Sequence, residues 1–503
     1  MPKAPSKART TKPGVRSGSS PRPKSADAVG GGGGAKRPTP GGKRSKAFSF
    51  PDYKTALKWV YDRTDIERTR PSRIDPKVFK LDRMRKIMEH LGNPERSLRC
   101  VHVAGTNGKG SICAMLTACL RECGYTVGTY TSPHLMDIRE RITINDHMVS
   151  YSHFADSLSR VAEAVAALPA RYGEATFFEV VTAAAFVHFA EQAVDIAVIE
   201  VGLGGKLDST NIITPEVALV GAIGKDHTQI LGATVDLIAE QKAGIFKPGV
   251  PALTFQQEAA AVGAMRRVAQ DVGALFEVIG GDVDFSCRFE ANPPLGPHMR
   301  VGLATPRFTF EHVPVPLQGE HQAPNCGLVL AAIDKLVERG FEAPEHKVIA
   351  GLEKTRLPGR MELAWKQPKV LLDGAHNAQA VTALVKSVGA HVQYDSMIVI
   401  FGCAADKDMD AMLAGVAMGA DKIIFTRTKN NPRAALPQEL ARRFTEVSGK
   451  MCQSAETLED ALAIAVRAAG REDLICITGS FYLVGEAKRL LADKAARTTP
   501  GEV

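Results

Sequence analysis

Residues 104–111, AGTNGKGS, decide the fold; they directly follow the apolar run CVHV. A glycine-rich turn with one lysine, placed between a strand and a helix, is typical of loops that hold phosphate at a helix N-terminus. The stretch departs from the usual P-loop pattern, because Val103 stands where a glycine five residues before Gly108 is expected, and Gly110 follows Lys109 in place of Ser or Thr. We predict a strand, a phosphate-binding loop and a helix; the alternative is a plain glycine turn.

The backbone amides and two side chains of this loop form a candidate nucleotide site. Amides from Thr106 to Gly110, backed by a helix that starts near Ser111, are expected to surround phosphate oxygens. Lys109 would neutralise the transferring phosphate, and the Ser111 hydroxyl could reach a magnesium ion. The predicted ATP-binding residues of the loop are Gly105, Thr106, Asn107, Gly108, Lys109, Gly110 and Ser111.

Outward from the loop, apolar strands alternate with helical stretches. The predicted strands are RCVHVAG, YTVGTYT, DIAVIEVG and VALVGAIG, and the helices between them include residues 111–124 and 176–192. Residues 260–316 change character, with DVDFSCRFE and PRFTFEHVPVPL as antiparallel strands. A second α/β series begins near residue 356. This order predicts an α/β protein with a P-loop-type, mostly parallel-sheet ATPase domain followed by a smaller Rossmann-like α/β domain.

Composition divides the chain further. Residues 1–48 hold twelve Lys and Arg and one acid, Asp27, which gives this segment a net charge of +11 and leaves −3 on the rest of the chain. This Gly-, Pro- and Ser-rich segment is predicted to be a disordered basic tail, either a solvated extension or a transient nucleic-acid contact. We predict a central ATP-binding domain over 49–354, a C-terminal domain over 355–495 and a flexible end over 496–503.

The cysteines and the apolar runs indicate the compartment. Nine cysteines are scattered without a CxxC pair, and several lie in apolar runs, as expected of small core residues in a reducing environment. No apolar run reaches the roughly 18 residues that span a membrane. We predict a cytoplasmic protein without a membrane partner.

Four strand ends carry polar residues that would meet at one edge of the sheet. Ser132 follows the strand YTVGTYT, and Glu200 ends the strand DIAVIEVG. His227 lies in a Gly-Lys-Asp-His turn after VALVGAIG, and Lys242 lies 15 residues further on. Each alone has an ordinary alternative, a strand-end Glu in water, a core His or a surface Lys. Together they indicate divalent-ion chemistry on a nucleotide.

Eleven motifs in the same order resemble a known family. They are AGTNGKGS, TSPHL, RERITIN, FFEVVTAAAF, EVGLGGKLDSTN, DHTQILGAT, KAGIFKPGVP, GEHQAPN, LPGR, DGAHN and GSFYLVGE. Together they closely resemble the bacterial type of the dihydrofolate synthase/folylpolyglutamate synthase family, in the Mur ligase superfamily. The resemblance extends from about residue 50 to 495 and leaves out the basic tail.

The resemblance implies an ATP-dependent ligase. Such enzymes phosphorylate a carboxylate of a pterin-containing substrate, and the amine of L-glutamate then attacks the acyl phosphate to form an amide, ADP and phosphate. The implied catalytic residues are Lys109, His227 and Lys242, the last carbamylated by CO2 in relatives. The implied ligands of two Mg²⁺ ions are Ser111, Ser132, Glu200, His227 and Lys242. A monovalent cation is a further expectation.

The resemblance also assigns residues in the second domain. Asn325, Arg360, Asp373 and His376 match residues at the ATP site, with Arg360 on the phosphates and Asp373 on the ribose. Ser480 and Tyr482 match the glutamate side of the site. The site is therefore expected between the domains.

Several alternatives remain open at this stage. The acceptor is dihydropteroate, a reduced folate, or both, and the sequence favours a bifunctional enzyme that acts as a monomer. The alternatives are a folylpolyglutamate synthase only, a Mur-type muropeptide ligase, or a nucleotide-binding protein without catalysis.

Overall fold

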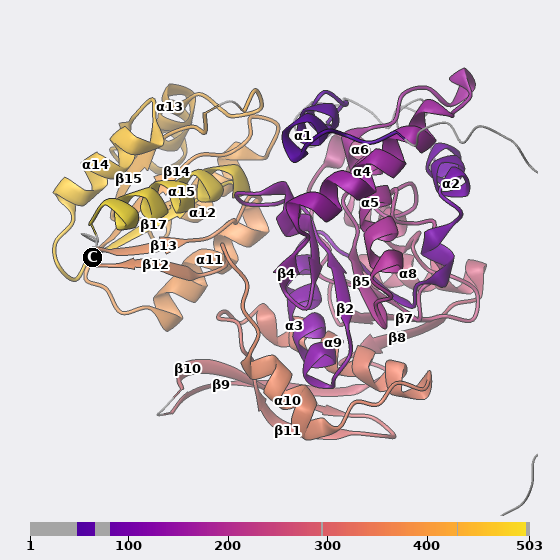
Figure 1. Cartoon of the computed structure of the whole chain (residues 1–503). Helices are drawn as coiled ribbons and strands as arrows, with labels where there is room; N and C mark the ends of the chain where they lie inside the picture. The colour runs from indigo at the N-terminus through magenta and orange to yellow at the C-terminus, as the bar shows by residue number, and fades with distance from the viewer. Residues whose placement is uncertain (1–47, 66–80, 293–294, 430, 499–503) are drawn as a thin grey trace, which may run out of the picture. The chain divides into compact units, whose positions relative to one another are not determined.

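The computed structural model describes residues 48–65, 81–292, 295–429 and 431–498, which fall in one unit beginning at Phe48. Its largest sheet is built from β1 (Cys100–Ala104), β2 (Val127–Tyr130), β3 (Ile142–Ile144), β4 (His147–Met148), β5 (Ile196–Glu200), β6 (Val217–Val220), β7 (Pro251–Phe255) and β8 (Leu275–Ile279). The spatial order is β4-β3-β2-β5-β1-β6-β7-β8 (Figure 1). In the part of this order that runs β2-β5-β1-β6-β7-β8, every neighbouring pair is parallel. Strands β3 and β4 pair antiparallel at one edge of the sheet.

Helices cover both faces of this sheet. They are α1 (Tyr53–Tyr61), α2 (Leu81–His90), α3 (Lys109–Glu122), α4 (Tyr151–Ala166), α5 (Phe177–Glu191), α6 (Thr228–Leu231), α7 (Val235–Ala243), α8 (Ala259–Val272), α9 (Gln322–Glu338) and α10 (Glu345–Glu353). Short 3-10 helices lie at Pro94–Ser97, Ile138–Arg141 and Ala170–Tyr172. Alternate residues of β5 face opposite cores: Ile196 and Val198 pack with α3 and α9, whereas Ala197 and Ile199 pack with α4 and α5. Burial on both faces explains why the strands are continuous apolar runs.

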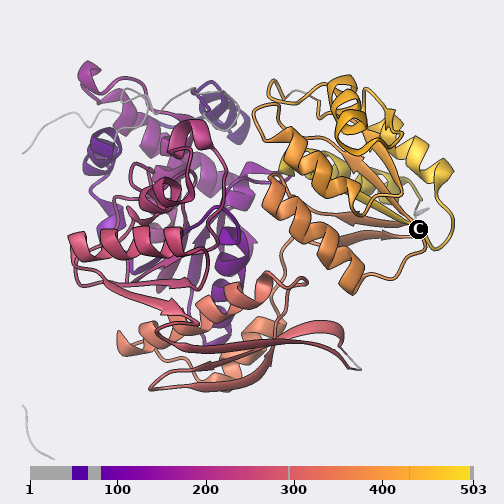
Figure 2. The same ribbon diagram turned by 180° about the vertical axis from the view of Figure 1, so that it is seen from behind.

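A small antiparallel sheet follows the large one. Its strands are β9 (Asp284–Asn292), β10 (Gly296–Ala304) and β11 (Thr309–Pro314), with β10 in the middle. Met299, Val301 and Phe310 pack into the core that α3 and α9 share. Figures 1 and 2 both show this sheet beside α10.

The last third of the chain forms a six-stranded sheet. Its strands are β12 (Glu362–Lys366), β13 (Lys369–Leu372), β14 (Met397–Phe401), β15 (Lys422–Phe425), β16 (Gln453–Ser454) and β17 (Leu474–Thr478). The order is β12-β13-β17-β14-β15-β16, and β12 alone in this sheet pairs antiparallel. One face packs against α11 (Ala378–His391), α12 (Met409–Ala417) and α13 (Pro437–Ser448). The other packs against α14 (Leu458–Ala468) and α15 (Phe481–Thr498).

The predicted fold class is confirmed: a mostly parallel sheet with a phosphate-loop connection is followed by a second α/β sheet. The quoted strands appear as β1, β2, β5 and β6, and the predicted antiparallel strands as β9 and β11. The region 260–316 also contains most of α8, the parallel strand β8 and the unquoted strand β10. The predicted basic tail lies outside the described residues except for Phe48, and the predicted end over 496–503 lies outside them from residue 499 on.

The cysteine prediction needs one correction. Six of the nine cysteines are buried, and Cys123 and Cys452 are half-buried, but Cys287 is exposed on β9. Strand β9 is an edge strand of the three-stranded sheet, so Cys287 has a neighbouring strand on one side only. Among the described helices, none is long and apolar enough to cross a membrane.

Candidate active site

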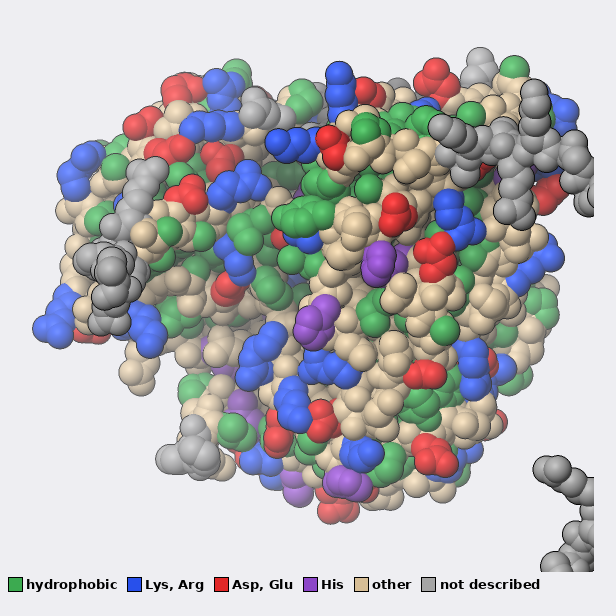
Figure 3. Space-filling model, in the orientation of Figure 1, with side chains coloured by type: hydrophobic (Ala, Val, Ile, Leu, Met, Phe, Trp, Pro, Cys, Tyr) green, Lys and Arg blue, Asp and Glu red, His purple; other side chains and the backbone are tan. Residues whose placement is uncertain are grey.

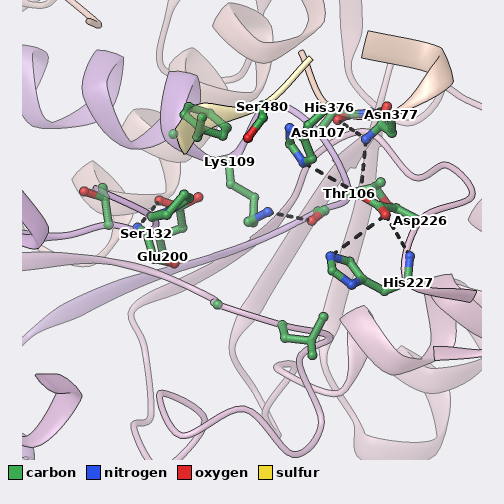
Figure 4. A pocket seen from close by; sticks show the side chains of 18 of the residues that line it. Thr106, Asn107, Lys109, Ser132, Glu200, Asp226, His227, His376, Asn377 and Ser480 are labelled. Carbon is green, nitrogen blue, oxygen red and sulfur yellow. Dashed lines mark hydrogen bonds and ion pairs between the residues drawn. The ribbon is translucent and has the colours of Figure 1, made fainter. Parts of the chain in front are cut away.

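One large cavity of about 1310 Å³ lies where the carboxyl ends of β1, β5 and β6 meet residues of the six-stranded part. Lys109, Glu200 and His227 line it from the first part of the chain. Arg360 and Ser480 line it from the second. Figure 4 shows the labelled side chains gathered around this cavity. Such a cavity, with a few charged groups that converge, is the usual form of an enzyme site.

The glycine-rich loop connects β1 to α3. Gly108 precedes α3 with φ +86°, a conformation that favours glycine, and it lets the chain turn directly into the helix. The amides of Thr106 and Asn107 already donate to the carbonyl of Ala222, at 2.8 and 3.1 Å. The predicted set of phosphate-binding amides, Thr106 to Gly110, therefore includes two amides that are already hydrogen-bonded within the protein. The amides at and after Gly108, in the first turn of α3, have no acceptor within the helix and remain for a phosphate.

Two lysines approach the same carbonyl beside the loop. Lys109 Nζ donates to Gly105 O at 3.2 Å, and Lys242 Nζ donates to the same oxygen at 2.9 Å. Lys242 is 5 % exposed. Burial, with a smaller contribution from the Lys109 charge, lowers the pKa of Lys242 to about 7. The Lys242 amine is therefore partly neutral at physiological pH, unlike an ordinary lysine.

Glu200 occupies the end of β5 as a buried carboxylate. Its Oε2 accepts the backbone amide of Ser132 at 3.1 Å. Burial raises the pKa of Glu200, and the nearby cations Lys109, Arg360 and Arg141 oppose that shift. A buried acid that faces cations across a cavity is suited to bind a metal ion or a charged substrate.

Asp226, the residue before His227, holds together several charged groups. Its Oδ1 accepts from Lys407 Nζ at 2.5 Å, and its Oδ2 lies 3.7 Å from Nε2 of His376. Burial alone would raise the pKa of Asp226, but His227, Lys407 and His376 hold it well below its usual range. Burial lowers the pKa of His227 to about 4 and that of His376 to about 3. Lys407 is therefore the cation that balances Asp226 at neutral pH.

Amide side chains connect the loop to the second part. Asn377 Nδ2 donates to Asn107 Oδ1 at 2.9 Å and to Asp226 Oδ2 at 3.3 Å. Asn107 Nδ2 in turn donates to Gln379 Oε1 at 2.9 Å. Asn377 also caps α11, because its Oδ1 accepts the amide of Ala380. The helix start that follows β13 is thus fixed against the phosphate loop.

Arg360 and Asp373 form the other side of this junction. The Arg360 guanidinium stacks 4.3 Å from the ring of Phe481. Burial lowers the pKa of Arg360, while Asp373 and Glu200 act to raise it. Both carboxylate oxygens of Asp373 accept backbone amides, from Met361 and Ala375, each at 2.9 Å. Asp373 thus fixes the backbone directly after Arg360 and directly before His376.

Known proteins resemble this chain in sequence and fold. The Mur ligase middle domain matches residues 103–255, and the Mur ligase glutamate ligase domain matches residues 359–481. A dihydrofolate synthase/folylpolyglutamate synthase of Bacillus subtilis is 33% identical over 445 residues, covering 88% of this chain and 100% of that protein. The chain belongs to the dihydrofolate synthase/folylpolyglutamate synthase family. The family's Mycobacterium tuberculosis member of the same name is 32% identical and covers 90% of this chain and 97% of its own length.

Solved structures of this family share the fold. A folylpolyglutamate synthase of Mycobacterium tuberculosis, complexed with ADP and AMPPCP, has a TM-score of 0.77 and 28% identity. The comparison covers 88% of this chain and 99% of that one. FolC of E. coli in complex with DHPP and ADP has a TM-score of 0.75 at 28% identity, covering 88% of this chain and 98% of that one.

Most of the residues predicted for a member of this family do line the cavity. They are Gly105, Thr106, Asn107, Gly108, Lys109, Gly110, Ser132, Glu200, His227, Lys242, Arg360, His376, Ser480 and Tyr482. Three predicted residues lie behind the cavity wall: Ser111, Asn325 and Asp373. Ser111 is buried in the first turn of α3, and Asn325 packs against Gly108 from α9. The Oδ1 atom of Asn325 has no hydrogen-bond partner within the described part of the chain.

Sequence reasoning missed Asp226, Lys407, Asn377 and Gln379. The signal was available in part, because Asp226 directly precedes His227 and Lys407 follows the strand end of β14. Their function as a group depends on contacts between residues 151 to 272 positions apart, which no local pattern reveals.

The donor set fits Mg²⁺ in this family. Across the described residues no three His, Cys, Asp or Glu side chains are placed to hold a metal by themselves. Mg²⁺ does not need such a cluster, because it is usually bound by one or two carboxylates with waters and substrate phosphates. Glu200 is one of the buried carboxylates that line the cavity, and His227 is neutral at pH 7 and so able to donate an electron pair.

Proposed function

We propose that this chain is an ATP-dependent ligase that adds L-glutamate to dihydropteroate and to the glutamate tail of reduced folates. The observation that carries the proposal is the meeting of Lys109, Glu200, His227 and Arg360 at one cavity. A carboxylate does not form an amide at neutral pH unless it carries a leaving group. The arrangement of cations around a phosphate loop supplies the conditions to make one.

The reaction follows from these positions. The acceptor carboxylate attacks the γ-phosphorus of ATP, an acyl phosphate forms and ADP leaves. Lys109 and the first amides of α3 balance the negative charge on the transferred group. The amine of glutamate then attacks the acyl carbon and loses a proton, and phosphate leaves with the electron pair of the broken C–O bond. Residues from the second part cover the cavity and keep water from the acyl phosphate.

Ser132, Glu200, His227 and Lys242, with Ser111 beside them, would hold two Mg²⁺ ions. Bound Mg²⁺ supplies positive charge to the phosphate oxygens. Carbamylation of Lys242 would turn a cation, which metal ions repel, into an anionic oxygen donor. Its support is the lowered pKa, since CO2 reacts with the neutral amine. The monovalent cation remains a prediction, which the potassium dependence of turnover would test.

The remaining predicted residues divide between the two other substrates. Arg360 and His376 are proposed to contact the ATP phosphates and nucleoside, and Asp373 and Asn325 to act from behind them. Ser480 and Tyr482, at the start of α15, are proposed to contact the incoming glutamate. The N-terminus of a helix beside a hydroxyl group suits the carboxylates of glutamate.

The test is ADP release by the purified protein with Mg-ATP and glutamate, with dihydropteroate or tetrahydrofolate as acceptor. Turnover with both acceptors supports the bifunctional enzyme. Turnover with tetrahydrofolate only assigns it as a folylpolyglutamate synthase. No turnover with either would overturn the proposal and favour a muropeptide ligase or a nucleotide-binding protein without catalysis. A monomer in the cytoplasm also remains a prediction, and sedimentation velocity tests the first part of it.

A further inference from the structure

The cavity has an arm that leads away from the phosphate loop along α3. Gly110, Ala114, Thr117 and Arg121 all line it. These positions follow one another at helical spacing, so they form one face of α3. From the first to the last the arm is about 16 Å long, at 1.5 Å per residue. It therefore extends well beyond the space that one transferred phosphate needs.

Residues of β2, β3 and β4 line one side of this arm. Thr129 of β2 pairs directly with Thr143 of β3, which pairs with Met148 of β4. Cross-strand partners project to the same face of a sheet, and all three residues line the cavity. The hydroxyl of Thr117 on α3 lies 2.8 Å from that of Thr129, which joins the helix to this side of the arm. The arm thus carries threonine hydroxyls beside the apolar side chains of Ala114 and Met148.

Four cations line the outer part of the arm: Arg121, Lys354, Arg356 and Lys488. Three of them contact an acid, because Arg121 pairs with Asp146, Lys354 with Glu122 and Lys488 with Glu362. Figure 3 shows Lys and Arg side chains on this face, over α3 and α10.

Arg356 differs from the other three cations. It is exposed, and its hydrogen bonds go to the carbonyls of Glu353 and Thr355. Carbonyl groups carry no net charge, so the Arg356 charge is available to an anionic ligand. Lys354 lies two residues away on the same connecting segment, with its side chain 55% exposed.

We propose that this arm binds the glutamate residues that an acceptor already carries. The inference rests on the proposed function. Each glutamate joined to the tail uses one carboxylate and brings two, so every addition leaves one more negative charge on the acceptor. The reacting end must lie at Lys109, and the earlier residues must therefore leave the phosphate loop along an open path. The arm begins at Gly110 and ends among cations, and about 16 Å accommodates several extended residues at about 3.5 Å each.

The test compares acceptors with one and with three glutamates. In the double variant Lys354→Gln/Arg356→Gln the ratio of kcat/KM for the triglutamate to that for the monoglutamate should fall roughly threefold to tenfold, as expected for two exposed charge contacts. Arg442→Gln is the matched control. Its side chain is 60% exposed on α13, outside the cavity, and the ratio should not change. Rising salt should lower the wild-type ratio, because screening acts more strongly on the more highly charged acceptor.

Two results would overturn the inference. One is an unchanged ratio in the double variant with an unchanged melting temperature. The other is an equal loss for both acceptors, which would place the two cations in a step common to every substrate. If the wild-type protein turns over neither acceptor, the proposed ligase function itself is refuted. This outcome is distinct from the two above, in which the wild-type protein is active.

Discussion

Lys242 has the properties of a lysine poised for modification. Its amine is buried, donates to Gly105 O and has its pKa lowered to about 7. Because the native pKa is lowered, the neutral fraction grows as pH rises through 7, from about a tenth at pH 6 to about nine tenths at pH 8. Carbamylation should follow the same direction.

We expect a carbamate signal in ¹³C NMR after addition of labelled bicarbonate, stronger at pH 8 than at pH 6. Lys242→Arg should lose the signal and at least a hundredfold in kcat, since the proposed metal site would then lack its proposed anionic donor. Lys247→Arg is the control, because Lys247 is a second partly buried lysine whose pKa is lowered to about 8, outside the cavity. A signal that survives in Lys242→Arg would place the carbamate elsewhere.

Two buried glutamates should respond to the same substitution in opposite ways. Both line the cavity, but Glu200 accepts one backbone amide, whereas Glu179 forms a buried ion pair with Arg83 at 2.8 Å. Glu200→Gln should raise the Mg²⁺ concentration needed for turnover and reduce kcat at least a hundredfold, with little change in Tm. Glu179→Gln removes the carboxylate charge from a buried ion pair and should therefore lower Tm clearly more than Glu200→Gln does. Mg²⁺ titrations of turnover and thermal unfolding of both variants check this contrast; equal Mg²⁺ dependence of Glu200→Gln and wild type would refute the metal assignment.

At the scale of the element, the junction of β1 and α3 depends more on Gly108 than on Gly110. A Cβ at Gly108 would lie 2.5 Å from Asn325 Oδ1, and the backbone there has φ +86°. A Cβ at Gly110 meets nothing within 4 Å, inside the helix.

Gly108→Ala should therefore destabilise the fold by about 1–3 kcal/mol. Gly110→Ala should leave Tm unchanged or slightly higher, since alanine is the better helix former. Differential scanning calorimetry of the two variants measures this difference. Equal losses would mean that the loop adapts more freely than its packing indicates.

The same scale shows what the sequence can predict. Strands β1, β5, β14 and β17 are apolar runs buried on both faces, so their composition alone identifies them. Strand β12 was not predicted, because its residues ELAWK are partly exposed at the sheet edge and lack a continuous apolar run. Strands β4 and β16 have two residues each, too few for any periodic pattern. Edges and short strands depend on pairing partners far along the chain.

At the scale of the whole molecule, Asp226 and Lys407 bring the two α/β parts together. Their side chains are 6% and 9% exposed, and 181 positions separate them in sequence. The resemblance to a family predicted the loop, the proposed metal ligands and Arg360. It did not predict the contact between Asp226 and Lys407, because neither residue lies in a sequence motif that indicates its partner.

Lys407→Met should leave Asp226 buried without its balancing cation and weaken the junction. We expect a larger radius of gyration by small-angle X-ray scattering and a roughly tenfold or greater rise in KM for ATP, since losing a buried partner costs several kcal/mol. Lys422→Gln, an exposed lysine on β15 that donates to a backbone carbonyl, serves as the control. An unchanged scattering profile together with an unchanged KM would show that the amide contacts alone hold the junction.

Those amide contacts have a consequence for inhibition. Asn107 belongs to the phosphate loop, yet its side chain is bonded to Asn377 and Gln379 across the cavity. Any ligand that reorients Asn107 must therefore shift the balance between the closed junction and an open one, and closure must in turn shift the affinity of that ligand by the same factor. A small molecule that formed hydrogen bonds with the side chains of Asn107, Asn377 and Gln379 would replace their contacts with one another and keep the two parts of the site apart. It would block the enzyme while resembling neither a nucleotide, an amino acid nor a pterin.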